Sequence, residues 1–183
     1  MTKLLQIAIE VNKLHLNRRL QKKLHWRAHH DQLTGLLNRQ AMEDEVSRRF
    51  KVEQFNCALL LLDLDNFKKI NDTYGHGSGD CVLQQLRKRL ITVVSEFDLL
   101  ARLGGDEFMV LLKLHSPDAA MALSMAERFH QVLGVPFGIN DQQVLLGISI
   151  GIAIPPDHER TDAPRRSRHV SRQVARALAQ RRV

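Results

Sequence analysis

The chain has 183 residues, of which 44% are apolar, enough for one domain with a hydrophobic core and an extension. Its formal net charge is +7, but residues 157–183 hold eight Arg against three acidic residues and therefore carry +5 of that charge. The remaining +2 argues against a nucleic-acid-binding domain.

No run of residues approaches the roughly 18 consecutive apolar residues of a membrane span, and no signal peptide is evident. Cys57 and Cys81 both lie in apolar surroundings. We expect them to be reduced core residues of a cytoplasmic protein rather than a disulfide pair.

Residues 3–28 contain neither Gly nor Pro and predict a long helix. Its apolar residues follow two seams, first Ile7, Val11 and Leu14, then Leu16, Leu20 and Leu24. The pattern is as typical of a helix that packs on its own domain as of a coiled coil with a second chain.

The helix is followed by His29, His30 and Asp31, residue types that bind metals. Adjacent side chains on a helix diverge, so these three residues are poor joint ligands and we do not favour a metal site there. Thr34-Gly35 breaks the helix, and residues 39–50 predict a second one with an apolar stripe at Met42, Val46 and Phe50.

Residues 57–63 predict a strand buried on both faces, because six apolar residues follow one another without interruption. The strand runs into Asp63-Leu64-Asp65, and strand alternation places both carboxylates on one side of the chain. Carboxylate oxygens in such an arrangement are suited to a hard divalent cation.

A short helix over residues 66–74 precedes a segment with Gly at positions 75, 77 and 79. We expect this segment to be a loop, either a plain one or one that cradles a phosphate. Asp80 then opens a helix to about Ser95, because a negative charge is favoured at a helix N-terminus.

Two apolar runs, residues 99–103 and 108–112, flank Gly104-Gly105-Asp106-Glu107. Two glycines between strand-like runs predict a tight hairpin, since Gly accepts positive φ angles without steric cost. Adjacent carboxylates repel each other unless a cation or solvent intervenes. The turn is therefore either a solvated acidic turn or a metal and phosphate site whose glycines let a nucleotide approach the backbone.

Ser116-Pro117-Asp118 is a strong helix start, and that helix is expected to end at Gly134. Strands follow near residues 135–139 and 143–154, with a turn at Asn140-Asp141. The order of elements predicts an α/β sandwich in which helices flank a central mixed sheet, with an N-terminal helix in addition.

Four segments together resemble the GGDEF domain of the diguanylate cyclase family. They are residues 31–39 (DQLTGLLNR), 63–80 (DLDNFKKINDTYGHGSGD), 102–108 (RLGGDEF) and 149–153 (SIGIA), in family order and at family spacing. The resemblance covers about residues 29–156 and implies a fold like the palm of polymerases and the nucleotide cyclases. It divides the chain into a signalling helix (1–28), a GGDEF domain (29–157) and an atypical Arg-rich tail (158–183).

The resemblance implies condensation of two GTP molecules into cyclic di-GMP by a homodimer, with Mg²⁺ or Mn²⁺ as the metal. The metal would be held by Asp63, the Leu64 carbonyl, Asp106 and Glu107, and one of the last two would also assist deprotonation of the 3′-hydroxyl. Lys68 would have a catalytic role, by stabilising charge on the transferring phosphate. GTP would be bound by Asn71 and Asp80 on the guanine edge, and by His76, Gly104 and Gly105 around it. Helix capping is the alternative role for Asn71 and Asp80. A helix such as residues 3–28 often connects the domain to an upstream sensor; none is present, so the chain is expected to be a fragment or a minimal member.

Two positions depart from the family pattern. The product-inhibition motif Arg-x-x-Asp reads Ser95-Glu96-Phe97-Asp98 here, without its Arg. The C-terminal helix that supplies a Lys and an Arg to the GTP phosphates is replaced by residues 165–172, which contain neither Tyr nor Lys. A degenerate domain that binds GTP or a partner protein without turnover is therefore the alternative function. The abrupt change near residue 158 also suggests a shifted reading frame; the alternative is real divergence, since residues 169–181 could form a helix.

Overall fold

The computed structural model describes residues 2–49, 56–115 and 119–154. Its elements in chain order are α1 (Thr2–His29), α2 (Arg39–Arg49), β1 (Cys57–Leu64), α3 (Phe67–Tyr74), α4 (His76–Leu90), β2 (Leu99–Gly104), β3 (Glu107–Lys113), α5 (Ala119–Leu133), β4 (Phe137–Ile139), β5 (Gln142–Val144) and β6 (Ile148–Ala153). Phe50, the predicted helix start at residues 116–118 and the tail after residue 154 lie outside the described residues.

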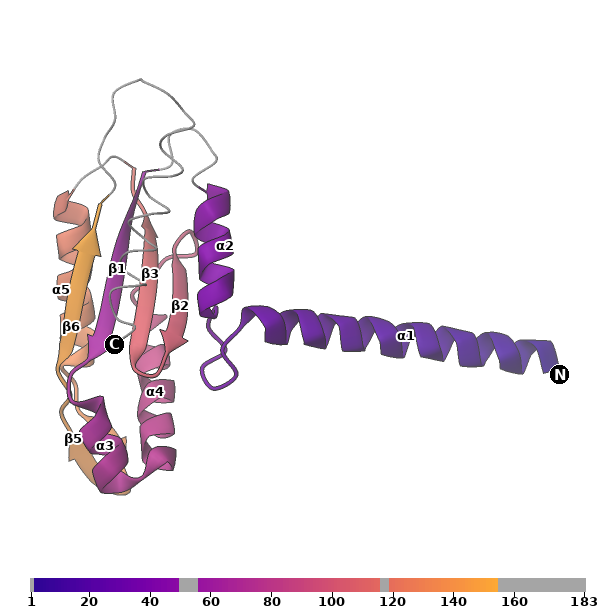
Figure 1. Ribbon diagram of the computed structural model, residues 1–183, viewed down its shortest axis with the longest axis horizontal. Coiled ribbons are helices and arrows are strands. Elements are labelled where there is room, and N and C mark those ends of the chain that lie inside the picture. The colour runs from indigo at the N-terminus through magenta and orange to yellow at the C-terminus, as the bar shows by residue number, and fades with distance from the viewer. Residues whose placement is uncertain (1, 50–55, 116–118, 155–183) are drawn as a thin grey trace.

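The main sheet has the strand order β2-β3-β1-β6, with β1 in its interior (Figure 1). All three pairings between these strands are antiparallel, and an isolated bridge between Leu37 and Ala101 is parallel. Helices cover both faces of this sheet, which confirms the predicted α/β sandwich with a central mixed sheet. β4 and β5 form a separate two-stranded sheet.

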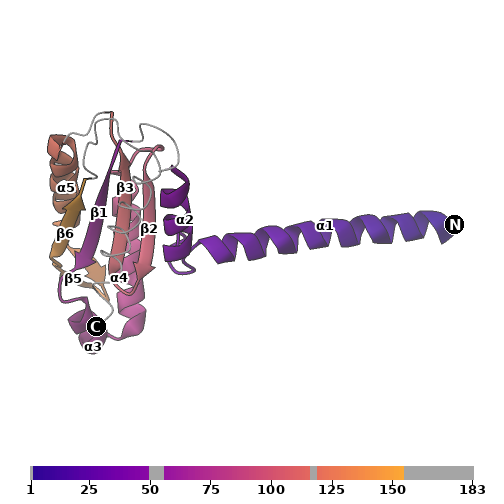
Figure 2. The same cartoon turned by 45° about the horizontal axis from the view of Figure 1, so that its top comes forward.

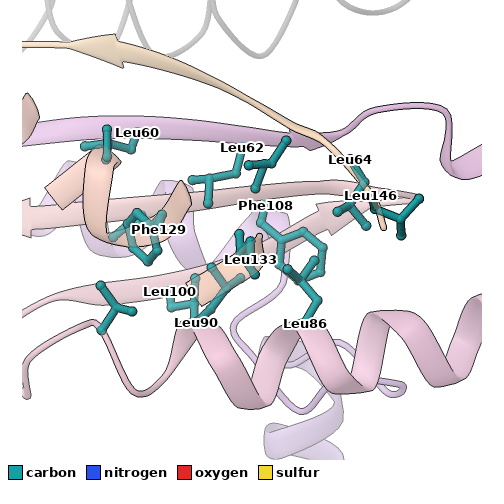
Figure 3. Packing of buried hydrophobic residues seen from close by; sticks show 14 of the residues in the cluster. Leu60, Leu62, Leu64, Leu86, Leu90, Leu100, Phe108, Phe129, Leu133 and Leu146 are labelled. Atoms are coloured by element: carbon teal, nitrogen blue, oxygen red, sulfur yellow. The ribbon is translucent and has the colours of Figure 1, made fainter. Parts of the chain in front are cut away.

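Alternate residues of β1 serve two different hydrophobic clusters, because successive side chains of a strand point to opposite faces. Leu60, Leu62 and Leu64 pack with Phe108 of β3 against α4 and α5, as Figure 3 shows. Cys57 and Leu59 pack on the other face, against Met42 and Val46 of α2. The continuous apolar run of β1 is therefore explained by burial on both faces.

Helix α1 extends away from the sheet in both views of the ribbon (Figures 1 and 2). Many of its large apolar side chains are exposed, including Ile7, Val11, Leu14, Leu16, Leu20 and Leu24. Of the two alternatives for this helix, packing on its own domain is therefore contradicted, and pairing with a second chain stays a prediction. No helix in the described parts of the chain is long and apolar enough to cross a membrane.

The segment at residues 76–79 is not a loop, contrary to the sequence-based expectation. These residues form the first turn of α4, and only Gly75, with a φ angle of 82°, separates α3 from α4. Gly79 is buried, and a Cβ atom there would lie 2.0 Å from Oδ1 of Asn71. The glycine is thus required by close packing of α4 against α3. The helix also ends at Leu90, earlier than the expected Ser95.

Two further predictions are corrected by the structure. The strand expected at residues 143–154 is divided into β5 and β6, which belong to different sheets. Cys57 is buried as expected, but Cys81 is exposed, because α4 directs its neighbours Val82 and Leu83 into the core instead. The turn at Asn140-Asp141 is confirmed, with positive φ angles at both residues.

Candidate active site

Asp63 and Glu107 are direct partners in the antiparallel pairing of β1 with β3. Directly opposed residues in such a pair have Cβ atoms about 5 Å apart and share one face of the sheet. Both residues are half-buried, at the end of the sheet where β1 leads into α3. Two acidic side chains are thus held side by side, where their mutual repulsion favours a bound cation.

Gly104 ends β2, and Gly105 and Asp106 form the turn to β3 at this same end of the sheet (Figure 1). Gly104 and Gly105 have φ angles of 142° and 55°, a combination that L side chains rarely adopt, and both are exposed. The predicted hairpin is therefore confirmed. Asp106 is the second residue of the turn and is half-buried, so the three predicted acidic metal ligands come from the end of β1 and from the β2–β3 hairpin.

Arg39, the first residue of α2, reaches the hairpin from the face that α2 covers. Its Nη2 donates to Oε2 of Glu107 at 3.4 Å, and its Nε donates to the carbonyl oxygen of Leu103 at 3.4 Å. The Arg39 and Glu107 side chains are 34% and 21% exposed. A partly shielded ion pair therefore holds one of the predicted metal ligands.

Arg102, a residue of β2, also fixes the hairpin. Its Nε and Nη2 donate to the carbonyl oxygen of Gly105 at 3.0 and 2.8 Å, while its Nη1 donates to Asp31. Burial by itself would raise the pKa of Asp31, but hydrogen bonds from Thr34 and the guanidinium of Arg102 outweigh it and lower that pKa below its ordinary value. Asp31, in the segment that follows α1, is thus stabilised in its ionised form.

The predicted GTP-binding side chains lie on α3 and on the start of α4. Lys68, His76 and Asp80 are exposed, whereas Asn71 is half-buried against Gly79. Figure 1 shows α3 at the end of the sheet that carries the hairpin. The structure therefore brings these residues to the same end as Asp63 and Glu107. His76 opens α4 rather than lying in a loop.

Asp65 has a structural role. Its Oδ1 accepts a hydrogen bond from Oγ of Ser149 at 2.7 Å, and its backbone N–H donates to the carbonyl oxygen of Gly147. A Cβ atom at Gly147 would lie 2.5 Å from Oδ2 of Asp65, so only glycine lets this carboxylate approach. The contact ties the end of β1 to the start of β6.

The donor set fits a hard divalent cation, since it offers carboxylate oxygens and no sulfur or nitrogen ligand. Within residues 2–49, 56–115 and 119–154, no three His, Cys, Asp or Glu side chains gather into one ligand group. Mg²⁺ is commonly held by one or two carboxylates together with water and substrate phosphates. The opposed pair of Asp63 and Glu107 is consistent with that kind of site.

Sequence reasoning assigned no role to Arg39 or to Arg102. Both belong to segments that carry the family resemblance, Arg39 as the last residue of 31–39 and Arg102 as the first of 102–108. Their partners lie 68 and 71 residues away along the chain. Each motif therefore contains a basic residue that the sequence shows, but the acidic partner of that residue became evident only in the folded structure.

A family model described as "Diguanylate cyclase, GGDEF domain" matches residues 28–182, a range that continues past residue 157. The chain is 41% identical over 140 residues to the diguanylate cyclase TpbB of Pseudomonas aeruginosa, covering 74% of this chain and 32% of TpbB. It is also 41% identical over 142 residues to the cyclic di-GMP phosphodiesterase PdeR of Escherichia coli, covering 77% of this chain and 21% of PdeR. The chain thus spans about a fifth to a third of the length of these curated relatives.

A solved structure of the GGDEF domain of TpbB superposes with a TM-score of 0.66 at 39% identity, covering 79% of this chain and 90% of that one. The coiled coil and GGDEF domain of DgcB from Caulobacter crescentus gives a TM-score of 0.77 over all of this chain and 97% of that one. At 21% identity the second likeness shows the fold alone. Because the family model covers most of the chain and TpbB shares 41% of the aligned residues, the chain belongs to the GGDEF domain family.

Proposed function

We propose that this chain is a diguanylate cyclase that condenses two GTP molecules into cyclic di-GMP and releases pyrophosphate. The observation that carries the proposal is the opposed pair Asp63 and Glu107, beside an intact Gly104-Gly105 turn. The relatives TpbB and PleD, a response regulator of Caulobacter vibrioides, align with the chain at 41% and 40% identity. The cyclases of this family are metal-dependent, and we propose Mg²⁺ or Mn²⁺ as the metal.

Asp63, the Leu64 carbonyl, Asp106 and Glu107 would hold the metal. When bound, the metal would neutralise charge on the phosphates and favour ionisation of the attacking 3′-hydroxyl. Lys68, on the exposed side of α3, would add a positive charge near the transferring phosphate. The half-buried amide of Asn71 and the carboxylate of Asp80 would select guanine, since a carboxylate accepts hydrogen bonds from N1–H and the 2-amino group, which adenine does not offer.

Two active sites have to face each other, because each GTP attacks the other. We propose that a homodimer brings them together and that α1, with its exposed apolar seams, contributes to the pairing. An upstream sensor protein or domain is the proposed source of the input signal.

The test is to incubate the purified chain with GTP and Mg²⁺ and to measure cyclic di-GMP by mass spectrometry. We expect product from the unaltered chain and none from Asp106→Ala or Glu107→Ala, with thermal unfolding little changed because neither side chain belongs to the core. Asp72→Ala, an exposed acidic residue of α3, is the matched control. Full activity of either active-site variant, with Mg²⁺ as the only cation, would refute the assignment.

The alternative function is a GTP-binding or protein-interaction module without turnover. It is favoured by residues 165–172, which lack the Lys and Tyr of the family's C-terminal helix. Saturable GTP binding without product, under conditions where TpbB is active, would support this second function.

A further inference from the structure

We propose that Arg39 competes with the divalent cation for the carboxylate of Glu107, and thereby sets the metal concentration at which the active site loads. The inference rests on the proposed function, because it assumes that Glu107 is a metal ligand. It assigns a positioning role to Arg39, which acts through Glu107.

Arg39 forms an ion pair with Glu107. The guanidinium of Arg39 lies 3.4 Å from Oε2 of Glu107, one of the two carboxylate oxygens that a cation would use. Its second hydrogen bond, to the carbonyl oxygen of Leu103, holds it on the hairpin. A positive group thus occupies the neighbourhood of an oxygen that the cation needs.

The guanidinium of Arg39 also offsets negative charge at the site. Asp63 lies opposite Glu107, so removal of the guanidinium would leave two facing carboxylates with one fewer positive neighbour. A dication and a guanidinium a few ångströms apart repel each other even in a high dielectric, on a scale that corresponds to about tenfold in affinity. Arg39 therefore stabilises the metal-free site and disfavours the loaded one.

Arg39 follows a residue that is hydrogen-bonded to the end of α1. Asn38, its neighbour, donates from its backbone N–H to the carbonyl oxygen of His29 and from Nδ2 to that of Ala28. These two carbonyl groups belong to the last turn of α1. The residue that restrains Glu107 is therefore anchored beside the end of α1, and a shift of that helix end would alter the competition.

The test is to measure Mn²⁺ affinity by electron paramagnetic resonance of free Mn²⁺, with the full chain at low ionic strength. We expect Arg39→Ala to bind Mn²⁺ about tenfold more tightly than the unaltered chain. Arg39→Lys should remain near the unaltered affinity, because it keeps the positive charge. Arg48→Ala is the control, since Arg48 lies on the same helix but is exposed and pairs with Glu45.

The variant Glu107→Gln distinguishes a failure of the proposed metal site from a failure of the proposed competition by Arg39. If Mn²⁺ binding to the unaltered chain is not weakened by Glu107→Gln, the proposed metal site itself is wrong. If Glu107→Gln weakens binding but Arg39→Ala leaves it unchanged or weaker, with circular dichroism showing an intact fold, the competition is refuted and Arg39 only supports the hairpin.

Discussion

Arg102 and Asp31 form an ion pair, in which one guanidinium nitrogen contacts both carboxylate oxygens, and this pair joins the hairpin to the segment following α1. Nη1 of Arg102 lies 3.1 Å from Oδ1 and 3.2 Å from Oδ2 of Asp31, and the two side chains are only 12% and 22% exposed. The same guanidinium donates twice to the carbonyl oxygen of Gly105. The position of the Gly-Gly turn is thus linked directly to the base of the N-terminal helix.

We expect a double-mutant cycle of Asp31→Ala and Arg102→Ala to give a coupling energy of about 1–3 kcal/mol in the free energy of unfolding. Hydrogen bonds to charged, shielded groups contribute on that scale. Urea denaturation measures the four free energies. The pair Glu45 and Arg48 is the control and should couple more weakly, because the Arg48 side chain is 66% exposed. A coupling no larger than that of the control pair would contradict the prediction.

The lowered pKa of Asp31 predicts a pH dependence of stability. A carboxyl group whose pKa is depressed in the folded state stabilises the protein above its unfolded pKa, here 3.8, and loses that contribution as the pH falls through the lower folded value. The unaltered chain should therefore be more stable than Asp31→Asn at pH 7, and this advantage should shrink below about pH 4. Urea unfolding of both proteins at pH 7 and pH 3 provides the measurement. An advantage that persists undiminished at pH 3 would show that the charge of Asp31 is not its source.

Inhibition by the product cyclic di-GMP is expected to be weak, because Ser95 stands where the family's inhibitory motif has Arg. In the structure Asp98 is already engaged: its Oδ2 accepts hydrogen bonds from the backbone N–H and the hydroxyl of Ser95, and its Oδ1 accepts one from the backbone N–H of Lys113. We expect Ser95→Arg to increase sensitivity at least about tenfold, since a guanidinium recognises phosphate and guanine in a bidentate manner.

Progress curves with added cyclic di-GMP measure this inhibition. Ser95→Gln, which adds length without charge, is the control variant. Submicromolar inhibition of the unaltered chain would show that another residue supplies the missing contact.

The Arg-rich segment after residue 157 gives a prediction about the gene. Residues 157–183 contain eight Arg and no Lys, although Lys is frequent earlier in the chain. We expect that translation of another reading frame past codon 158 yields the family's Ala-Asp…Tyr…Ala-Lys pattern. The family match extends to residue 182, so resequencing is needed to decide between a shifted frame and real divergence. If neither alternative frame gives that pattern, the tail is genuine.

The sequence by itself determined those features of the protein that depend on neighbouring residues. The apolar run of β1, the Gly104-Gly105 hairpin and the turn at Asn140-Asp141 each follow from local periodicity or from residues that accept positive φ angles. The acidic residues that follow the apolar run of β1 and the two glycines of the hairpin could also be read directly from the sequence. The motifs then indicated the family.

Only the tertiary structure decided which distant residues meet. Arg39 reaches Glu107 and Arg102 reaches Asp31 because α2 and the segment after α1 pack beside the hairpin, and no local pattern encodes that contact. The sequence predicted that Gly79 lies in a loop, but it lies in α4. Its glycine is explained by the packing of α3 against α4, which leaves no room for a Cβ atom there. Local propensity acts over a few residues, whereas the position of a side chain at the active site depends on how whole elements pack.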